Sequence, residues 1–379
     1  MNRIEHLLQE LCPGGVTSKK LGDLADVGTG SSNRNESTGD GKYPFYVRSK
    51  TVYLTDEYEF DEEAIVIPGE GGIGDIFHYV NGRYALHQRA YRIRLKSESI
   101  ETKFALYFMK SNFKKFILTK AVSATVTSIR KPMIMDFQIP VPPLEVQREI
   151  VRILDTFTEL EAELEAELDA RKKQYEHYRE SVLSFTGDRS VGRVPLLEIA
   201  TRNAGTAITA EQMRRLNDDL GEITVFAAGA TKAKIRRQDL PAKDVINKPG
   251  IVVKSRGYIG FEYCETPFTH KSELWSYCID EQVALPRFIK HFLETQSSRL
   301  QALARSKSVK LPQLSVADTD KLLVPLPSLQ VQSHICELLD RFETLTNDLS
   351  SGLPAEIQTR RNQYEYYRNQ LLTFKELVA

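Results

Sequence analysis

The sequence predicts an α+β protein with two similar domains of mixed strands and helices and two long coiled-coil helices. The first observation is an internal repeat, because VPPLEVQREIVRILDTFTEL at 141–160 returns as LPSLQVQSHICELLDRFETL at 326–345. The second is that QYEHYRESVLSF at 174–185 returns as QYEYYRNQLLTF at 363–374. A long repeat fixes architecture, and two copies favour a pseudo-two-fold molecule over a solenoid. Such a molecule suits a partner that is itself nearly two-fold, such as DNA.

Length and composition place the chain among ordinary globular proteins. It has 379 residues, of which 41% are hydrophobic and 27% charged, which allows two or three domains with separate cores. No apolar run approaches the ~18 residues of a membrane span, and the polar start MNRIEHLLQE does not resemble a signal peptide. The four cysteines are scattered without CxxC spacing, which argues against zinc and favours free thiols. We therefore expect a cytoplasmic protein without a metal site.

A net charge of zero conceals an alternation of charge along the chain. Segments 1–143 and 187–327 carry a small excess of Lys and Arg, whereas 144–186 and 328–379 carry an excess of Asp and Glu. We take the basic segments as the two domains, the first with a short N-terminal helix, and the acidic segments as the long helices. The basic excess raises the expectation of nucleic-acid binding only slightly.

Segment 144–186 is expected to form one long helix. The two prolines at 142–143 suit a helix start, and Thr186-Gly187 supplies a stop. From Ile150 onward, apolar residues recur in steps of three and four, as in the seam of a coiled coil. The seam residues expected here are Ile150, Leu154, Phe157, Leu160, Leu164, Tyr175 and Tyr178.

Segment 328–379 repeats this seam but is interrupted by SSGLP at 350–354. A proline inside a helix loses a hydrogen bond and clashes with the preceding turn. A kink or a short loop is therefore expected near 350–354, followed by a last helix. The seam residues in this segment are Ile335, Leu339, Phe342, Leu345, Tyr364 and Tyr367.

The two basic segments resemble each other more faintly. EAIVIPGEGGIG at 63–74 aligns with GIVVKSRGYIG at 250–260, and short β-branched runs between Gly and Pro predict strands. FALYFMKSNFKKFIL and FIKHFLETQSSRLQAL predict amphipathic helices. His87 and His270 align as well, and each is expected to be structural. Matching patterns with unlike intervening residues indicate one fold with two different recognition surfaces.

No catalytic signature stands out. The chain lacks a GxxxxGK[ST] loop, and the glycine-rich GEGGIG at 69–74 lacks the context of a dinucleotide site, so we interpret it as a turn or loop. The histidines form no ligand cluster, and no nucleophile lies at a recognisable spacing from a base. The residues indicate no catalytic site and no cofactor in this chain.

Polar and basic clusters remain at loop-like places in both basic segments. Arg, Lys, Asn, Gln, Ser and Thr are the residues that reach phosphates and base edges. One such cluster alone is more often a solvated loop, but clusters recur at corresponding places in the two segments. The candidate DNA-binding residues are Thr29, Ser31, Ser32, Asn33, Arg34, Arg48, Lys50, Gln88, Arg89, Thr125, Thr127, Arg130 and Lys131 in the first, and Arg202, Asn203, Thr231, Lys232, Lys234, Lys254, Arg256, Lys271, Arg305, Lys307 and Lys310 in the second.

The chain resembles the specificity (S) subunit of type I restriction-modification systems. The resemblance is carried by LCPGGVTSKKLGDLADV near the N-terminus and by IPVPPLEVQREIVRILDTF at 139–157 with its echo at 324–342. RKKQYEHYRESVLSF at 171–185 and RRNQYEYYRNQLLTF at 360–374 add to it. The match covers essentially the whole chain and departs from the pattern at the SSGLP interruption.

This resemblance implies a function in host defence and DNA methylation. Two target recognition domains would each read one half of a bipartite, asymmetric site on double-stranded DNA, held apart by two antiparallel helices. Two modification subunits would bring S-adenosylmethionine, two restriction subunits would bring ATP and Mg, and this chain would have no catalytic activity. The alternatives are a self-contained DNA methyltransferase or nuclease with divergent motifs, and a DNA-binding regulator.

Overall fold

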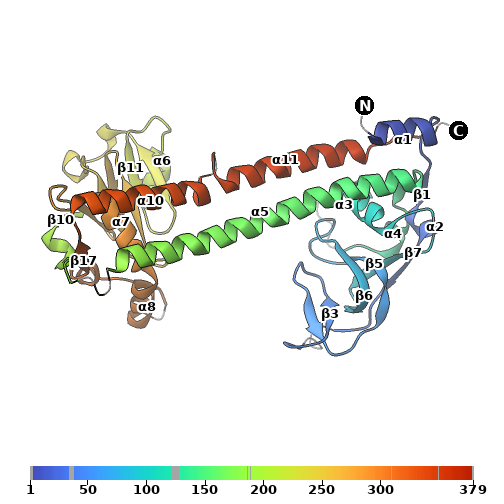
Figure 1. Ribbon diagram of the computed structural model, residues 1–379, viewed down its shortest axis with the longest axis horizontal. Helices are drawn as coiled ribbons and strands as arrows, with labels where there is room; N and C mark the ends of the chain where they lie inside the picture. Colours follow the sequence, from blue (N-terminus) through green and yellow to red (C-terminus); the bar gives the residue numbers. More distant parts are fainter. Residues whose placement is uncertain are drawn as a thin grey trace. The chain divides into compact units, whose positions relative to one another are not determined.

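The computed structural model describes residues 3–33, 38–120, 128–185, 187, 189–308, 310–348 and 350–377. The chain divides into two compact units, which we describe separately (Figure 1). The first unit comprises Met1–Leu164 and Ile357–Ala379, and the second comprises Glu165–Glu356. The helix α5 (Leu144–Ser184) is continuous and contributes residues to both units.

The first unit is built on a six-stranded sheet of order β2-β7-β5-β6-β3-β4. The pair β3–β6 is parallel, and the other neighbours are antiparallel. The central strand β5 is buried on both faces, since Ile65 and Ile67 join the main core while Ala64 and Val66 join a second cluster. Its strands are β2 (Ala25–Thr29), β3 (Tyr43–Tyr46), β4 (Tyr53–Thr55), β5 (Phe60–Pro68), β6 (His78–Leu86) and β7 (Ala90–Leu95).

Helices cover one side of this sheet. Phe104, Met109 and Phe113 of α3 (Thr102–Lys120) are buried in the same core as Ile65 and Ile93. A short ladder of β1 (Ser18–Lys20) with β8 (Gln138–Pro140) leads into α5. The remaining helices of this unit are α1 (Arg3–Leu11), α2 (Leu21–Leu24), α4 (Lys131–Met135) and α11 (Leu353–Leu371), whose first residues belong to the second unit.

The second unit repeats this strand order in two pieces, β10-β16-β13-β14 and β12-β11-β15. The strand that matches β6 is interrupted at 265–267, where Pro267 has no amide hydrogen to continue a ladder. As with β3 and β6, β11 and β15 are parallel. The strands are β9 (Gly192–Pro195), β10 (Ala200–Ala204), β11 (Ile223–Phe226), β12 (Lys232–Ile235), β13 (Gly250–Lys254), β14 (Gly260–Cys264), β15 (Phe268–His270), β16 (Trp275–Ile279) and β17 (Leu323–Leu326).

The helices of the second unit follow the first with one difference. Where the first unit has α3, the second has two helices, α7 (Pro286–Thr295) and α8 (Ser297–Lys307), which meet at Gln296. The ladder β17–β9 matches β1–β8 and leads into α10 (Leu329–Asn347). The shorter helices are η2 (Leu196–Glu198), α6 (Ala210–Leu216), η3 (Arg237–Asp239), η4 (Ala242–Asp244) and α9 (Val316–Asp320).

The expected match between His87 and His270 is wrong by one residue. The amide of His87 donates to the carbonyl of Tyr46 at 2.9 Å, and the equivalent bond in the second unit joins Lys271 to Phe226 at 2.9 Å. His87 therefore corresponds to Lys271, because a strand register fixes which side chains face the core, whereas a shared residue type does not. Counting onward, Arg89 corresponds to Glu273 and Leu86 to His270.

The long helices pair within each unit through aromatic side chains. In the first unit, the ring of Phe157 lies 6.2 Å from that of Tyr364 and 5.6 Å from that of Tyr367. Glu161 lies one turn further along α5 and binds Arg361 at 2.6 Å, so α5 and α11 run antiparallel there. In the second unit, Tyr175 and Tyr178 contact Phe342, at 6.3 and 5.7 Å between ring centroids. The other seam residues are buried (Ile150, Leu154, Ile335, Leu339), half-buried (Leu160, Leu164) or exposed (Leu345).

The long helix of the second repeat is interrupted at SSGLP, as the sequence predicts. α10 ends at Asn347, α11 begins at Leu353, and Asp348 accepts a 2.8 Å hydrogen bond from the amide of Ser350. Hydrogen bonds from Ser350 and Ser351 lower the pKa of Asp348 to about 2. Within the described ranges, no helix combines the length and apolar character that a membrane crossing requires.

Candidate nucleic-acid interface

Three loops of the first unit converge on Glu70. Arg48 follows β3, Arg89 lies in the turn between β6 and β7, and both bind Glu70 Oε2, at 2.9 and 3.1 Å. Hydrogen bonds from Arg89 and then Arg48 hold the pKa of Glu70 below its usual range. Two expected DNA-binding residues are thus positioned by an acidic residue that the sequence analysis did not select.

A second set of expected residues joins this cluster through Gln88. Gln88 Nε2 donates to Asn33 Oδ1 at 2.6 Å. The backbones of Ser32 and His87 form an isolated parallel β-bridge. The hydroxyl of Ser31 donates to a carboxylate oxygen of Glu59 at 3.0 Å. The structure therefore brings Ser31, Ser32, Asn33, Arg48, Gln88 and Arg89 to one edge of the first unit.

The remaining candidates of the first unit lie around this edge or outside the described residues. Arg130 and Lys131 are exposed at the start of α4. This helix follows Ser128, whose backbone forms an isolated antiparallel β-bridge with that of Glu70. Thr29, at the end of β2, and Lys50 are exposed. Arg34, Thr125 and Thr127 fall outside the described residues.

In the second unit, a turn centred on Arg256 occupies the comparable place. The amide of Gly257 donates to the carbonyl of Pro312 at 2.9 Å. The backbones of Arg256 and Gln313 form an isolated antiparallel β-bridge. The turn projects Tyr258, which is 78% exposed. Lys310 and Arg305, both exposed, come from the segment that precedes the bridge, whereas Lys307 is paired with Asp318.

The turn between β15 and β16 adds a charged pair. Lys271 Nζ lies 2.8 Å from Glu273 Oε1. Burial acts to raise the pKa of Glu273, but the hydrogen bond from Lys271 and the charges of Lys271 and Arg256 lower it overall. Arg256 and Lys271 therefore share one acidic neighbour.

The prediction that Lys254 binds DNA is wrong, because its side chain is buried. It is 4% exposed, and its ammonium donates to the carbonyl of Ala227 at 2.7 Å and lies 3.2 Å from Glu262. Its pKa is lowered by burial. Because β13 turns this side chain inward, Lys254 has no surface with which to contact DNA, and we leave it out of the interface.

The other candidates of the second unit lie on β10 and around β12. Arg202 is paired with Asp320, and Asn203 Nδ2 donates to Cys278 Sγ at 3.2 Å. Lys232 is paired with Glu262, while Thr231 and Lys234 are exposed. Arg202 and Asn203 line a cavity of about 1160 Å³.

The residues that organise these clusters are not among the DNA-binding residues expected from the sequence. Glu70, Glu59 and Glu273 are acidic, and so fall outside the basic and amide residue types that indicate contact with DNA. Tyr258 carried a usable signal, since it is an aromatic residue between Gly257 and Gly260 in a basic turn, without a helical or strand pattern of apolar residues that would bury it.

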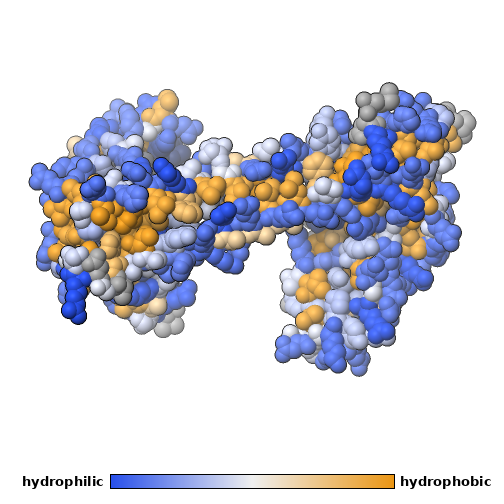
Figure 2. Space-filling model, in the orientation of Figure 1, coloured by the Kyte–Doolittle hydropathy of each residue, from blue (hydrophilic) through white to orange (hydrophobic). Residues whose placement is uncertain are grey.

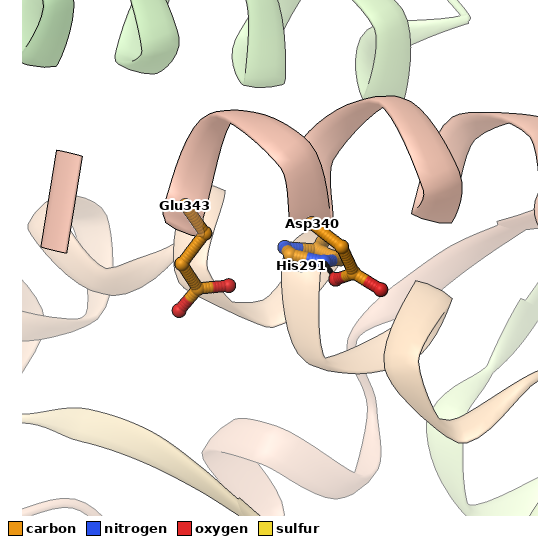
Figure 3. A group of neighbouring side chains, drawn as sticks. All are labelled: His291, Asp340 and Glu343. Atoms are coloured by element: carbon orange, nitrogen blue, oxygen red, sulfur yellow. Dashed lines mark hydrogen bonds and ion pairs between the residues drawn. The ribbon is translucent and has the colours of Figure 1, made fainter. Parts of the chain in front are cut away.

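One group in the described part of the chain places three metal-type ligands within 4.8 Å, namely His291, Asp340 and Glu343 (Figure 3). Its carboxylates are already neutralised by cations, since Lys290 Nζ binds both oxygens of Glu343 at 2.9 Å and Arg287 binds Asp340 at 2.8 Å. His291 Nε2 completes the network, 3.0 Å from Asp340 Oδ1.

The first unit contains the same network with different residues. Asp155, the repeat counterpart of Asp340, accepts hydrogen bonds from Lys103 and Tyr107, each at 2.6 Å. A tyrosine and a lysine are not a metal-ligand set, yet they make the same connection between α3 and α5. The group in Figure 3 therefore serves to fasten α7 to α10.

Comparisons with known proteins agree with this architecture. A family model described as the type I restriction modification DNA specificity domain matches residues 13–170 and 191–359. A type I specificity subunit of Mycoplasma pneumoniae is 28% identical over 84% of this chain and 95% of its own length. A type I restriction enzyme specificity subunit of Haemophilus influenzae is 27% identical, over 97% of this chain and 98% of its own.

A solved structure shares the fold. The crystal structure of a type I restriction-modification system S subunit from M. genitalium superposes with a TM-score of 0.62. The alignment covers 94% of this chain and 96% of that chain at 18% identity. The predicted fold class, with two pseudo-repeated mixed domains and long paired helices, is confirmed.

Proposed function

Because the chain belongs to the family of type I restriction modification DNA specificity domains, we propose that it is the DNA sequence-recognition subunit of a type I restriction-modification complex. One observation carries the proposal: a single strand order, β2-β7-β5-β6-β3-β4, recurs in the second unit with different side chains in its loops. Two copies of one recognition domain with unlike loops read two unlike half-sites. The DNA site is therefore bipartite and asymmetric.

The clusters around Glu70 and Arg256 support this function through their chemistry. Arginine, asparagine, glutamine and serine side chains bind phosphates and base edges, and all four types meet in the first cluster. The second cluster combines arginine and lysine with an exposed tyrosine. The unlike composition of the two clusters is what an asymmetric site requires.

The long helices are proposed as the platform for two modification and two restriction subunits. Val331, Leu338 and Leu345 recur every seven residues along α10 and are 42%, 38% and 40% exposed. Figure 2 shows hydrophobic residues gathered over α10. Such a seven-residue stripe is typical of a helix that packs against another helix. The partners, not this chain, would hold S-adenosylmethionine, ATP and Mg.

The test is reconstitution. The chain is combined with modification subunits of a type I system, and the methylated sites are mapped by sequencing. We expect one bipartite motif with unlike halves, and no methyl transfer or cleavage by the chain alone. A contiguous motif, or methylation by the purified chain without partners, contradicts the proposal and favours a self-contained enzyme.

Exchange of one domain is the matching control for modularity. Replacement of 19–135 by the corresponding segment of another specificity subunit should change one half of the methylated motif and leave the other half intact. A change in both halves would show that the two domains do not read DNA independently.

A further inference from the structure

The turn after the central strand has the same backbone hydrogen bond in both units. After β5, the amide of Ile129 donates to the carbonyl of Gly69 at 2.8 Å. After β13, the amide of Leu314 donates to the carbonyl of Ser255 at 2.9 Å. A late segment of each domain therefore holds this turn in the same way.

A glycine fixes the shape of each turn. Gly71 has φ +68° and Gly257 has φ +74°, in the left-handed region that favours glycine. Glu70 and Arg256 directly precede these glycines and therefore occupy equivalent positions. The two domains thus present opposite charges at one structural site.

The partner charge is reversed as well. Arg89 binds Glu70 at 3.1 Å, and the residue that corresponds to Arg89 in the second unit is Glu273. The charge of Arg256 contributes to the lowered pKa of Glu273, after the larger effects of burial, which opposes it, and of Lys271. The same fold accommodates an acidic turn residue beside a basic partner in one unit and a basic turn residue beside an acidic partner in the other. Packing therefore does not determine the sign of the charge at the turn.

Both turns keep hydrogen-bonding capacity for a ligand. The side chain of Glu70 is 38% exposed, and both arginines bind its Oε2, so Oε1 accepts no hydrogen bond from a described residue. The half-buried side chain of Arg256 forms no ion pair with any residue that the structure describes. Its Nε is buried without a hydrogen-bond partner, so contact with a base would come from the terminal nitrogens of the guanidinium. Tyr258, mostly exposed, stands where the first unit has Gly72.

We propose that these two turns read base edges with opposite polarity, Arg256 donating to a guanine in one half-site and Glu70 accepting from an exocyclic amino group in the other. The inference rests on the proposed function. A guanidinium matches the O6 and N7 acceptors of guanine, whereas a carboxylate accepts from the N4 amino group of cytosine and, by the same chemistry, the N6 amino group of adenine. Arg48 and Arg89 offset the repulsion between Glu70 and the phosphates. Tyr258 packs against the base pair that Arg256 reads.

The experiment uses the complete complex with its modification subunits, after the wild-type motif has been mapped. Initial methylation rates are measured on duplexes that carry each single-base change in this motif. Arg256→Ala should reduce the preference for guanine at one position by roughly 10- to 100-fold, since a bidentate contact discriminates by that order. Glu70→Gln should relax one position in the other half-site. The reversed pair Arg256→Glu with Glu273→Arg should change the preferred base at the Arg256 position and nowhere else.

The control reverses a charged pair elsewhere in the sequence of the second unit, with one residue before β11 and the other after β12. Asp218 binds Arg236 at 2.6 Å, and Asp218→Arg with Arg236→Asp should leave the motif unchanged. Melting temperature and co-elution with the modification subunits establish that each variant is folded. Tyr258→Ala serves as a second variant that should disturb the fold little, because its side chain is mostly exposed.

The outcomes separate the two proposals. If Arg256→Ala and Glu70→Gln leave base preference unchanged, or weaken all sequences equally, the turns do not read bases and this inference is overturned while the proposed function stands. If the wild-type complex shows no bipartite motif, the proposed function itself fails.

Discussion

Gln147 donates a hydrogen bond from Nε2 to the carbonyl oxygen of Pro142 at 2.7 Å, which ties the first turn of α5 to the residues that lead into it. Its Oε1 accepts from the amide of Glu101 at 2.8 Å, just before α3. Gln332 makes the equivalent bond to Pro327 at 2.9 Å. The glutamine that recurs in the repeat is thus a buried fastener between the long helix and the domain beside it.

Loss of this fastener should destabilise the second unit. Gln332→Ala leaves buried backbone groups unsatisfied, at about 1–3 kcal/mol each. We expect a melting temperature several degrees below that of the wild type, measured by circular dichroism. Gln330→Ala, an exposed glutamine on the same helix, should melt like the wild type. Equal effects of the two substitutions would show that the buried hydrogen bonds contribute nothing.

Asp340 should make the second unit sensitive to acid. Burial alone would raise the pKa of Asp340, but hydrogen bonds from His291 and Arg287 lower it overall. A depressed pKa stabilises the fold above the pKa of the unfolded aspartate, about 3.9, and this stabilisation is lost as the pH falls through the folded-state value. The melting temperature of Asp340→Asn should therefore lie below that of the wild type near pH 7, with the gap narrowing below about pH 4. A gap that stays constant, or one equal to that of the exposed control Asp219→Asn, would contradict this assignment.

The aromatic contacts should hold α11 against α5 in the first unit. Phe157→Ala removes the rings' contact with Tyr364 and Tyr367, and we expect a loss of about 1–3 kcal/mol, less than for a fully buried phenylalanine. Limited proteolysis should release the C-terminal segment faster than in the wild type. Tyr366→Ala, on the exposed side of α11, should leave the proteolysis rate unchanged. Equal rates for Phe157→Ala and wild type would show that this pair does not secure the helix.

Unpaired surface lysines should matter more for DNA than paired ones. Lys310 is exposed, whereas Lys307 is already paired with Asp318. Lys310→Ala should lower the slope of log K against log salt by about 1, and Lys307→Ala by less. The measurement is fluorescence anisotropy of a duplex carrying the mapped motif, titrated with the assembled complex at several salt concentrations. Lys172→Ala, exposed on α5, should leave the slope unchanged, and a larger effect of Lys307 than of Lys310 would contradict the assignment.

Local pattern was enough to predict the long helices. The spacing of Ile150, Leu154 and Phe157 is a property of neighbouring residues, and its recurrence in a second copy removes ambiguity. The proline in SSGLP likewise marks the place where the second copy leaves the helix. These are consequences of short-range sterics and periodicity, which a single sequence carries in full.

The candidate interface depended on tertiary structure. The sequence selected Arg48 and Arg89 by residue type, but their convergence on Glu70 arises from three loops that meet only after the sheet has formed. Lys254 looked like a surface lysine, yet the pleat of β13 turns it inward. The sequence gives the sign of the charge on each side chain. Which ion pairs these side chains form depends on which distant loops the fold brings together.

The repeat itself shows the same division. The sequence determined that the chain contains two related halves, two long helices and no recognisable catalytic motif. Only the tertiary structure decided that His87 corresponds to Lys271, and that Glu70 and Arg256 stand at one site with opposite charge. The physical reason is that strand register depends on hydrogen bonds between segments far apart in the chain, and a shift of one residue turns every side chain to the other face.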